Sequence, residues 1–372
     1  MTDTLQPLVA DRRVLVCCGS GGVGKTTVAA ALGLAAAVAG RRAAVVTIDP
    51  AKRLADALGL AGLTNDPQPV PLLAGTTGTL HALMLDTKET FDALVRRESR
   101  DVTQTDRILQ NRFYRNISGA LSGTQEYMAM EKVHELVSCG RFDVVVIDTP
   151  PTRNALDFLT APRRLTRLLD NTLFRILMAP GRGAMRLVGA AAQTLLKPLS
   201  SVVGGEVVMD AIDFFQAFEG MEDGFRRRAM ETLDLLHDRS TAWVLVTSPR
   251  PEAVTEAVFF AGALDGTGVT VAAVVANRMQ PVFGEASPRL LGLPGPLGVM
   301  ARIVDEAATE AAAEEAALAP LLAALPDVAV VRITNRAGEV QDLAGLDMLA
   351  ADLVGAAPGA GDPGAARGRR AR

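Results

Sequence analysis

Short runs of apolar, mostly β-branched residues recur along this chain of 372 residues, separated by longer stretches with helical periodicity. Within the runs, the regular polar alternation of a half-exposed sheet is absent. Strands of this kind, with helices between them, are typical of a parallel sheet that is covered on both faces. The pattern therefore predicts an α/β fold with a doubly wound, mostly parallel sheet. The strands are expected at residues 13–18, 43–48, 80–86, 143–148, 242–247, 269–276 and 328–333.

Two of the spacings between these strands are too long for simple crossover connections. They follow the third and the fourth predicted strand, and loops of such length need structure of their own. Helical patterns within them lie at 90–97, 163–178, 184–199, 207–218 and 222–236. We therefore predict a single domain over residues 1–354, with helical insertions at about 88–138 and 158–236.

The last part of the chain contains a Pro- and Gly-rich segment, a helical pattern and a low-complexity tail. Residues 281–298 are rich in Pro and Gly and predict a loop, whereas residues 301–325 form an acidic, Ala-rich helical pattern. From residue 355 onward, Gly, Ala, Pro and Arg dominate. That composition predicts a disordered basic tail, which is either solvated or in contact with an anionic surface.

A glycine-rich segment directly follows the first predicted strand. Residues 19–27 read Gly-Ser-Gly-Gly-Val-Gly-Lys-Thr-Thr, and an Ala-rich helical stretch follows at 28–38. Glycines let the backbone curl tightly enough to aim several N–H groups at one anion, and the helix start adds its positive dipole end. Lys25 supplies a charge for the outer phosphates, and the Thr26 hydroxyl suits a Mg²⁺ ion that bridges them. The segment predicts a P-loop for a nucleoside triphosphate, with contacts from Gly21, Gly22, Val23, Gly24, Lys25, Thr26 and Thr27.

Polar residues end three other predicted strands, on the side where an open sheet binds its ligand. Asp148 follows Val144-Val145-Val146-Ile147 and can support the Mg²⁺ ion. Asp49 could orient the water that attacks the phosphate. Asn277 could pair with the edge of adenine. The alternatives are a strand cap for either aspartate and a turn residue for Asn277.

The composition narrows the function classes. The net charge of −4 argues against a broad basic surface for nucleic acid, so no nucleic-acid partner is expected. The three cysteines, Cys17, Cys18 and Cys139, form no C-x-x-C pair and indicate buried thiols in a reducing compartment. Neither a secretion signal nor a run of 18 apolar residues occurs, so a cytoplasmic protein is expected, with a peripheral location at the inner face of the membrane as a further option.

Three ordered motifs together resemble the anion-transporting ATPase family, which includes the arsenite-pump ATPase subunit and the ATPase that targets tail-anchored membrane proteins. They are the glycine-rich loop, the element Thr47-Ile48-Asp49-Pro50-Ala51 and the element Asp148-Thr149-Pro150-Pro151-Thr152. The resemblance implies ATP hydrolysis with Mg²⁺ in a dimer that encloses the nucleotide. It also implies that Asp49 positions water and contributes to the metal site with Asp148 and Thr26, that Lys25 is catalytic, and that Asn277 contacts adenine.

The chain departs from the family pattern in two places. Ser20 occupies the position of a second Lys, which in relatives reaches the nucleotide of the partner subunit. Such a cation can contribute about 10³–10⁵ in rate for related phosphoryl transfers, so slow turnover or a replacement cation is expected. Lys52, Arg53 and Arg153 are candidates, and a paralogous partner that keeps the Lys is another route. The C-x-x-C zinc clamp of targeting relatives is also missing, and with so few thiols arsenite binding is disfavoured.

The second insertion is rich in Phe and Met. Residues 158–230 hold six of the twelve Phe and five of the twelve Met. These side chains suit a groove for apolar helices of varied sequence, as the resemblance to targeting relatives implies. The alternative is that they pack the core of the insertion itself.

Three functions remain open from the sequence. The leading hypothesis is an ATPase switch, a homodimer or a heterodimer, whose ATP or ADP state controls binding of a hydrophobic helical client or a membrane-protein partner. The second is the energising subunit of an anion or metalloid efflux system. The third is a regulatory module that binds ATP with little turnover.

Overall fold

The computed structural model describes residues 4–49, 53–117, 124–150, 152–170, 205–336, 340 and 342–355. The predicted helix at 184–199 and almost all of the predicted tail lie outside these residues. The chain divides into two compact units. The sheet unit comprises Met1–Met84, Cys139–Leu156 and His237–Arg372, and the helical unit comprises Leu85–Ser138 and Asp157–Leu236. The assignment of a single domain over 1–354 stays a prediction.

The sheet unit is built on eight strands in the order β3-β4-β2-β5-β1-β6-β7-β8. All neighbours pair in parallel except β3, which is antiparallel to β4. The strands are β1 (Val14–Cys18), β2 (Arg42–Thr47), β3 (Gln68–Pro69), β4 (Thr79–Met84), β5 (Val144–Asp148), β6 (Thr241–Thr247), β7 (Val271–Met279) and β8 (Ala329–Thr334). The predicted mostly parallel sheet is confirmed, with one short strand added at its edge.

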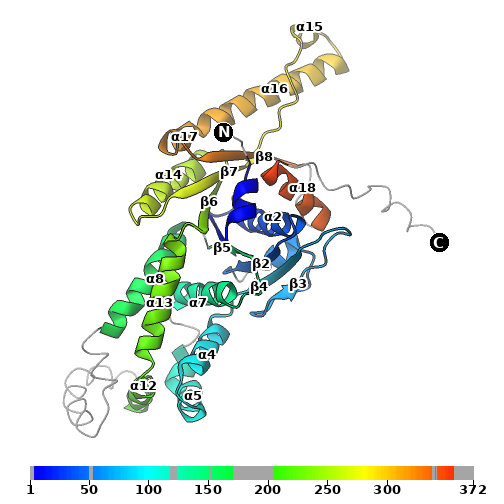
Figure 1. Cartoon of the computed structure of the whole chain (residues 1–372). Helices are drawn as coiled ribbons and strands as arrows, with labels where there is room; N and C mark the ends of the chain where they lie inside the picture. The colour runs from blue at the N-terminus through cyan, green and yellow to red at the C-terminus, as the bar shows by residue number, and fades with distance from the viewer. Residues whose placement is uncertain are drawn as a thin grey trace. The chain divides into compact units, whose positions relative to one another are not determined.

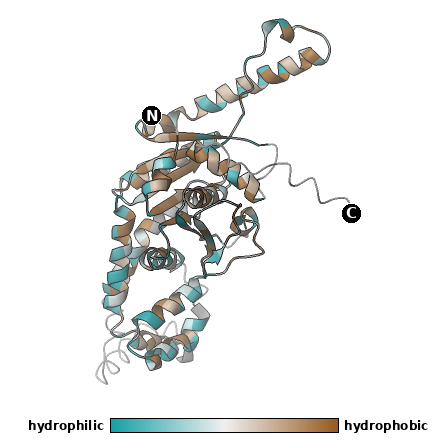
Figure 2. Ribbon diagram, turned by 45° about the vertical axis from the view of Figure 1, so that its right-hand side comes forward, coloured by the Kyte–Doolittle hydropathy of each residue, from teal (hydrophilic) through white to brown (hydrophobic). Residues whose placement is uncertain are grey.

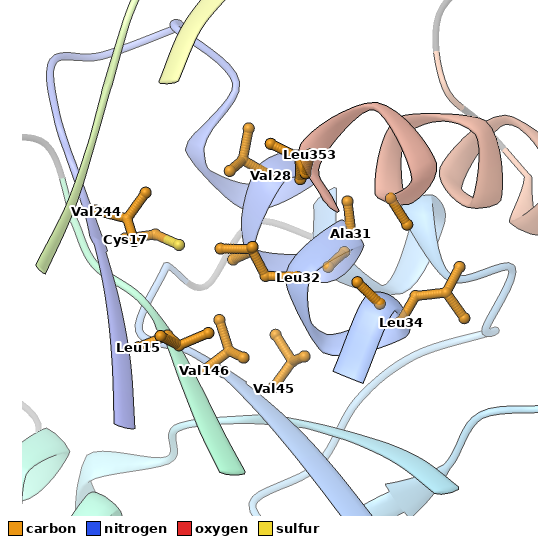
Figure 3. Close-up of a cluster of buried hydrophobic side chains, with 14 of the residues drawn as sticks. Leu15, Cys17, Val28, Ala31, Leu32, Leu34, Val45, Val146, Val244 and Leu353 are labelled. Atoms are coloured by element: carbon orange, nitrogen blue, oxygen red, sulfur yellow. The ribbon is translucent and has the colours of Figure 1, made fainter. Parts of the chain in front are cut away.

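The core of this unit lies between the central strands and the Ala-rich helix α2 (Lys25–Val38). Figure 3 shows α2 between the sheet and α18 (Leu343–Val354), with Leu32 close to Leu15 and Val146. Every residue of β1 is buried, which explains why its sequence has no polar alternation. Because small Ala side chains line α2, the helix can pack closely against strands on one side and α18 on the other.

The other helices of the sheet unit are α1 (Gln6–Asp11), α3 (Arg53–Ala57), α14 (Pro251–Asp265), α15 (Pro288–Leu291), α16 (Pro296–Ala317) and α17 (Ala319–Ala324). In Figure 1, α15 and the start of α16 project away from the sheet. The loop predicted over 281–298 is wrong in part, because α15 lies within it and α16 begins at Pro296. Proline is well tolerated at the first helical position, where its missing N–H has no intrahelical partner to lose.

The helical unit is held together by an aromatic core. Its helices are α4 (Thr87–Glu98), α5 (Val102–Leu109), α6 (Arg112–Ile117), α7 (Thr124–Ser138), most of α8 (Thr152–Asp170), α12 (Gly205–Ala217) and nearly all of α13 (Glu222–His237). Phe214, Phe218, Phe225 and Met221 are buried in this core together with Tyr114. These members of the predicted Phe and Met group therefore pack their own unit. Phe174, Met178 and Met185 lie outside the described residues.

A buried ion pair joins two helices of this unit. The Nε of Arg228 on α13 donates to Oε1 of Glu131 on α7 over 2.8 Å, and Arg97 on α4 reaches the same oxygen. A buried carboxylate needs such partners, because removal of one leaves an uncompensated charge.

Among the helices that the structure describes, none combines the length and apolar character that crossing a membrane requires.

Candidate nucleotide-binding site

The glycine-rich segment forms a loop between β1 and α2. Gly22 and Gly24 adopt φ values of 77° and 95°, a region that favours glycine. A Cβ atom added at Gly21 or Gly22 meets no atom within 4 Å, so the rim of the loop is open there. A Cβ at Gly24, in contrast, lies 2.3 Å from Nδ2 of Asn277. The loop is therefore closed on the side of β7 and open at its rim.

The start of α2 supplies backbone donors to this loop. Gly24 caps the helix without a side-chain hydrogen bond, and the first helical bond from beyond the cap runs from Val28 N to Gly24 O. The N–H groups of residues 24–27 consequently have no acceptor within the helix. With the helix dipole they are donors that suit an anion. The nucleotide contacts of Gly24, Lys25, Thr26 and Thr27 stay predictions.

Lys25 lies beneath the loop with only 7% of its surface exposed. Its Nζ donates to the carbonyl oxygen of Ser20 over 2.8 Å. Burial lowers the pKa of Lys25, while the carboxylate of Asp148 opposes that shift. The ammonium group is thus held at the loop by one backbone oxygen and one nearby charge.

Ser20 is turned into the protein. Its side chain is buried, and its Oγ has no hydrogen-bond partner among the described residues. A side chain in this position does not extend from the surface of the subunit. Of the three candidate replacement cations, Arg53 is exposed with its Nη1 4.0 Å from Oδ2 of Asp49. Lys52 and the side chain of Arg153 lie outside the described residues.

Asp148 and Asp49 meet at the carboxyl ends of neighbouring strands through Thr47. In the β2–β5 register Thr47 lies opposite Asp148, and its hydroxyl donates to Oδ2 of that carboxylate over 2.9 Å. The same hydroxyl oxygen accepts from the backbone N–H of Asp49 over 3.2 Å. The role of Thr47 was not predicted, because it depends on which residue of β5 lies beside it.

The environment of Asp148 tests whether a Mg²⁺ ion fits here. The side chain is almost fully buried, and its Oδ1 has no hydrogen-bond partner among the described residues. Burial raises the pKa of Asp148 to about 6, while the hydroxyls of Thr26 and Thr47 act in the opposite direction. A buried carboxylate oxygen beside a threonine hydroxyl is a suitable donor set for a cation that also binds phosphate oxygens. The residues present therefore fit Mg²⁺, which Thr26 and Asp148 would hold. The metal roles of Thr26, Asp49 and Asp148 stay predictions.

The side chain of Asn277 connects β7 to the P-loop. Its Nδ2 donates to the carbonyl oxygen of Val23 over 2.8 Å, and its Oδ1 accepts from the N–H of Arg278 over 2.9 Å. One amide hydrogen and one oxygen lone pair remain for a ligand. The adenine contact of Asn277 stays a prediction, whereas its contact with the P-loop is a feature that sequence reasoning missed.

The cysteines supply no free thiolate to this site. Cys17 and Cys18 are fully buried at the end of β1, with Cys17 opposite Asp148, and burial raises the pKa of both thiols. Cys139 is exposed, so the prediction of buried thiols is wrong for that residue. Buried neutral thiols are poor metal ligands, because the thiolate is the binding form.

Asp148→Asn is expected to stabilise the nucleotide-free protein at neutral pH. The folded state holds the Asp148 proton more tightly than the unfolded chain does, since the pKa rises from 3.8 to about 6. Ionisation of this group therefore lowers the free energy of unfolding as pH rises from about 4 to about 6, by about 3 kcal/mol in total. Asn does not titrate, so the variant gains on the wild type through that window and keeps the gain above it.

Urea denaturation from pH 4 to pH 7, with EDTA and without nucleotide, measures this difference. The single tryptophan, Trp243, is buried in β6 and reports the unfolding of the sheet unit. Asp143→Asn is the matched control, because its hydrogen bonds with Arg42 lower the pKa of Asp143 to about 2. That variant should lose stability at neutral pH instead. Equal stability of wild type and Asp148→Asn across the whole range contradicts the expectation.

Comparison with known proteins identifies the family of this chain. A sequence model described as anion-transporting ATPase matches residues 12–287. The chain is 30% identical to protein SCO2128 of Streptomyces coelicolor over 79% of its own length and 68% of that protein. It is 33% identical to an ATPase ASNA1 homolog of Babesia bovis, over 42% of this chain and 40% of that protein. It is 29% identical to ATPase ARSA2 of Chlamydomonas reinhardtii, over 62% of this chain and 58% of that protein. The chain thus spans less than two thirds of these two named ATPases. The family's sequence model, however, matches most of this chain. The chain therefore belongs to the anion-transporting ATPase family.

Proposed function

We propose that this protein is a Mg²⁺-dependent ATP hydrolase whose nucleotide state controls its association with a second subunit. The observation that carries the proposal is the convergence of four groups at one edge of the sheet. The N–H groups of residues 24–27 and the Lys25 ammonium lie at the start of α2, which follows β1. Asp148, with its unpartnered Oδ1 among the described residues, ends β5, and the Asp49 carboxylate follows β2. These three strands are neighbours in the sheet. A polyphosphate, a cation and an attacking water are the ligands that this set of charges suits.

Each residue has a role in the proposed reaction. The backbone donors and Lys25 bind the phosphates and stabilise the charge that develops on them. Thr26 and Asp148 would hold Mg²⁺, which would neutralise phosphate charge when bound. Asp49 orients the attacking water and accepts its proton. Thr47 connects the Asp148 carboxylate to the backbone N–H of Asp49, so a change at Asp148 can shift the position of Asp49.

The inward position of Ser20 supports slow turnover by the isolated chain. A cation supplied across a subunit interface contributes about 10³–10⁵ in rate in related enzymes, and Ser20 cannot supply it. Arg53 is the described candidate that lies beside the predicted water-positioning carboxylate. The three cysteines do not form a set of thiolates, which favours this function over metalloid transport.

An exposed apolar surface supports the proposed association. We call residues 280–318 the arm, which comprises α15 and α16. Within the arm, Oε2 of Glu314 accepts a hydrogen bond from the N–H of Gln280 over 2.6 Å. The carboxylate of Glu315 pairs with Arg332 of β8. Of the fifteen large hydrophobic side chains that are exposed in the described residues, eight lie in the arm. They are Val282, Phe283, Leu290, Leu293, Leu297, Val299, Met300 and Ile303.

A second copy of the chain is the occupant that this surface suits. Figure 2 shows hydrophobic and hydrophilic segments along α16, where Arg302 is followed by Asp305, Glu306 and Glu310. In an antiparallel pair of arms, Arg302 of one copy faces these acidic residues of the other. The arm begins directly after Met279, the last residue of β7, and β7 also carries Asn277, which contacts the P-loop. The base of the arm is therefore attached to the strand that contacts the predicted nucleotide site, which gives nucleotide binding a route to influence assembly.

Phosphate release and light scattering test the proposal together. With Mg²⁺ and ATP, we expect slow phosphate release and a particle of twice the 39.0 kDa chain mass, with less dimer in ADP and least without nucleotide. The double variant Met300→Ser/Ile303→Ser should weaken the dimer by about 100-fold or more, because it removes two central apolar contacts. Phe259→Ser is the control, since Phe259 is equally exposed but lies on α14.

Three results contradict the proposal, in whole or in part. No heat from Mg·ATP in calorimetry and no phosphate release would remove its basis in the loop. An ATP-dependent dimer that the arm variant leaves intact would show that another surface holds the subunits together. A wild-type chain that binds and hydrolyses ATP as a monomer would remove the assembly step alone.

A further inference from the structure

Arg278 has a backbone conformation that is unusual for its type. It has φ of 63° and is the one non-glycine residue with positive φ among the described residues. The pairing of β7 with β8 shifts register between Asn277 and Met279, so Arg278 is the extra residue of a bulge. Bulges re-aim side chains at sheet ends, and non-glycine residues in this region carry strain that is often associated with function.

The bulge is fixed to the P-loop by hydrogen bonds. The N–H of Arg278 donates to Oδ1 of Asn277, whose Nδ2 donates to Val23 of the loop. The absence of a side chain at Gly24 is what allows this approach, because a Cβ there meets Nδ2 of Asn277 at 2.3 Å. Arg278 is consequently held at a constant position beside the loop, although it is an exposed residue.

The guanidinium of Arg278 makes no hydrogen bond or ion pair in the part of the chain that the structure describes. Arg332 of the adjacent strand β8, in contrast, pairs with Glu315. Glycine at this position would relieve the backbone without the loss of any described side-chain contact. The retained side chain therefore points to a ligand outside the chain.

The strand order identifies which part of a nucleotide lies near Arg278. Around β1 the order is β2-β5-β1-β6-β7. Asp49 and Asp148, which suit the terminal phosphate and the metal, follow β2 and end β5 on one side of the loop. With that end of the nucleotide fixed there, the nucleoside extends to the other side, over the ends of β6 and β7, where the bulge lies.

We propose that Arg278 is a nucleoside-binding residue whose planar guanidinium packs against the face of the base. Arginine stacks well on aromatic rings and needs no specific pattern on the base edge. Asn277 can use its remaining amide hydrogen and lone pair on that edge, so the two neighbours divide the recognition of face and edge. This inference rests on the proposed function, because it assigns a part of the same nucleotide.

Calorimetry with three ligands tests the assignment. Arg278→Ala should raise the Kd for Mg·ATP and for Mg·GTP by about 3- to 30-fold, because stacking does not depend on the base edge. The Kd for Mg·tripolyphosphate, which has no base, should stay unchanged. Arg278→Lys, which keeps the charge but not the plane, should show an intermediate loss.

Three further variants separate this role from a structural one. Arg239→Ala is the control for charge, because Arg239 is exposed and precedes β6 at the opposite end of the strands, so this variant should bind all ligands like the wild type. Asn277→Ala removes the bond to Val23 and should weaken tripolyphosphate as well as ATP. Arg278→Gly should raise the thermal midpoint by about 2–4 °C through relief of strain, while it weakens ATP as Arg278→Ala does.

The outcomes are distinct. Equal weakening of ATP and tripolyphosphate by Arg278→Ala overturns the assignment and shows that the residue acts on the loop or on the phosphates. Unchanged binding of every ligand overturns it as well. In both cases the wild type still binds ATP, and the proposed function stands. A wild type that binds none of the ligands contradicts the proposed function first.

Discussion

Asp49→Asn is expected to slow ATP hydrolysis by about 10²–10⁴-fold while Mg·ATP binding stays close to that of the wild type. Asn has the size of Asp, and the Asp49 backbone keeps its hydrogen bond to Oγ1 of Thr47. The loss is therefore confined to the carboxylate, which in the proposed mechanism orients the attacking water and accepts its proton. Binding of the phosphates depends on Lys25 and the loop, whose ammonium group and backbone donors the substitution leaves in place.

Single-turnover phosphate release and calorimetry on the same preparation separate the two effects. Asp56→Asn, an exposed carboxylate on the helix that follows, is the control for removal of a negative charge. A variant that hydrolyses ATP at the wild-type rate would show that Asp49 does not handle the water. If the variant loses both Mg·ATP binding and hydrolysis, Asp49 would instead be a ligand of the metal in the ground state.

The predicted features that the structure bears out depend on local pattern. All seven predicted strands are present, and the ends that carry Asp49, Asp148 and Asn277 lie at one edge because the strands are parallel. The P-loop was recognisable because strand, glycine turn and helix are consecutive in the chain. Short-range order of this kind survives folding, since burial on both faces demands continuous apolar strands.

The features that were missed depend on contacts between distant segments. Thr47 gained a role only when the register placed it opposite Asp148, which is more than a hundred residues away. Arg278 gained one through a bulge that exists because β8 pairs with β7 on both sides of it. Sequence pattern fixes which residues face the same side of a strand, but not which residue of another strand lies beside each.

The arm shows how composition can mislead. Its Pro and Gly content predicts a loop over 281–298, yet Pro288 and Pro296 are the first residues of α15 and α16. Proline disfavours a helix interior but is compatible with a helix start, so position matters more than frequency. The same segment carries the largest share of exposed apolar side chains, a property that only the folded chain reveals.

Lys25→Ala is expected to weaken Mg·ATP by about 10²–10³-fold. Truncation of one partner in a desolvated charge contact costs about 2–5 kcal/mol, and Lys25 is 7% exposed beneath the loop. The effect has a second part, because the Lys25 charge also lowers the pKa of Asp148. Its removal leaves that buried carboxyl more protonated near neutral pH and so less able to hold a cation.

The two parts can be separated by pH. If loss of the phosphate contact alone accounts for the change, wild type and Lys25→Ala differ by the same factor at pH 6.5 and pH 8.5. If Asp148 contributes, the difference is larger at pH 6.5, since the carboxyl of the variant is then partly protonated. Lys88→Ala, which removes an exposed lysine side chain paired with Asp92 in the helical unit, is the control for a lost lysine. Binding of Mg·ATP by Lys25→Ala with wild-type affinity at both pH values would show that the loop does not bind the phosphates through this ammonium group.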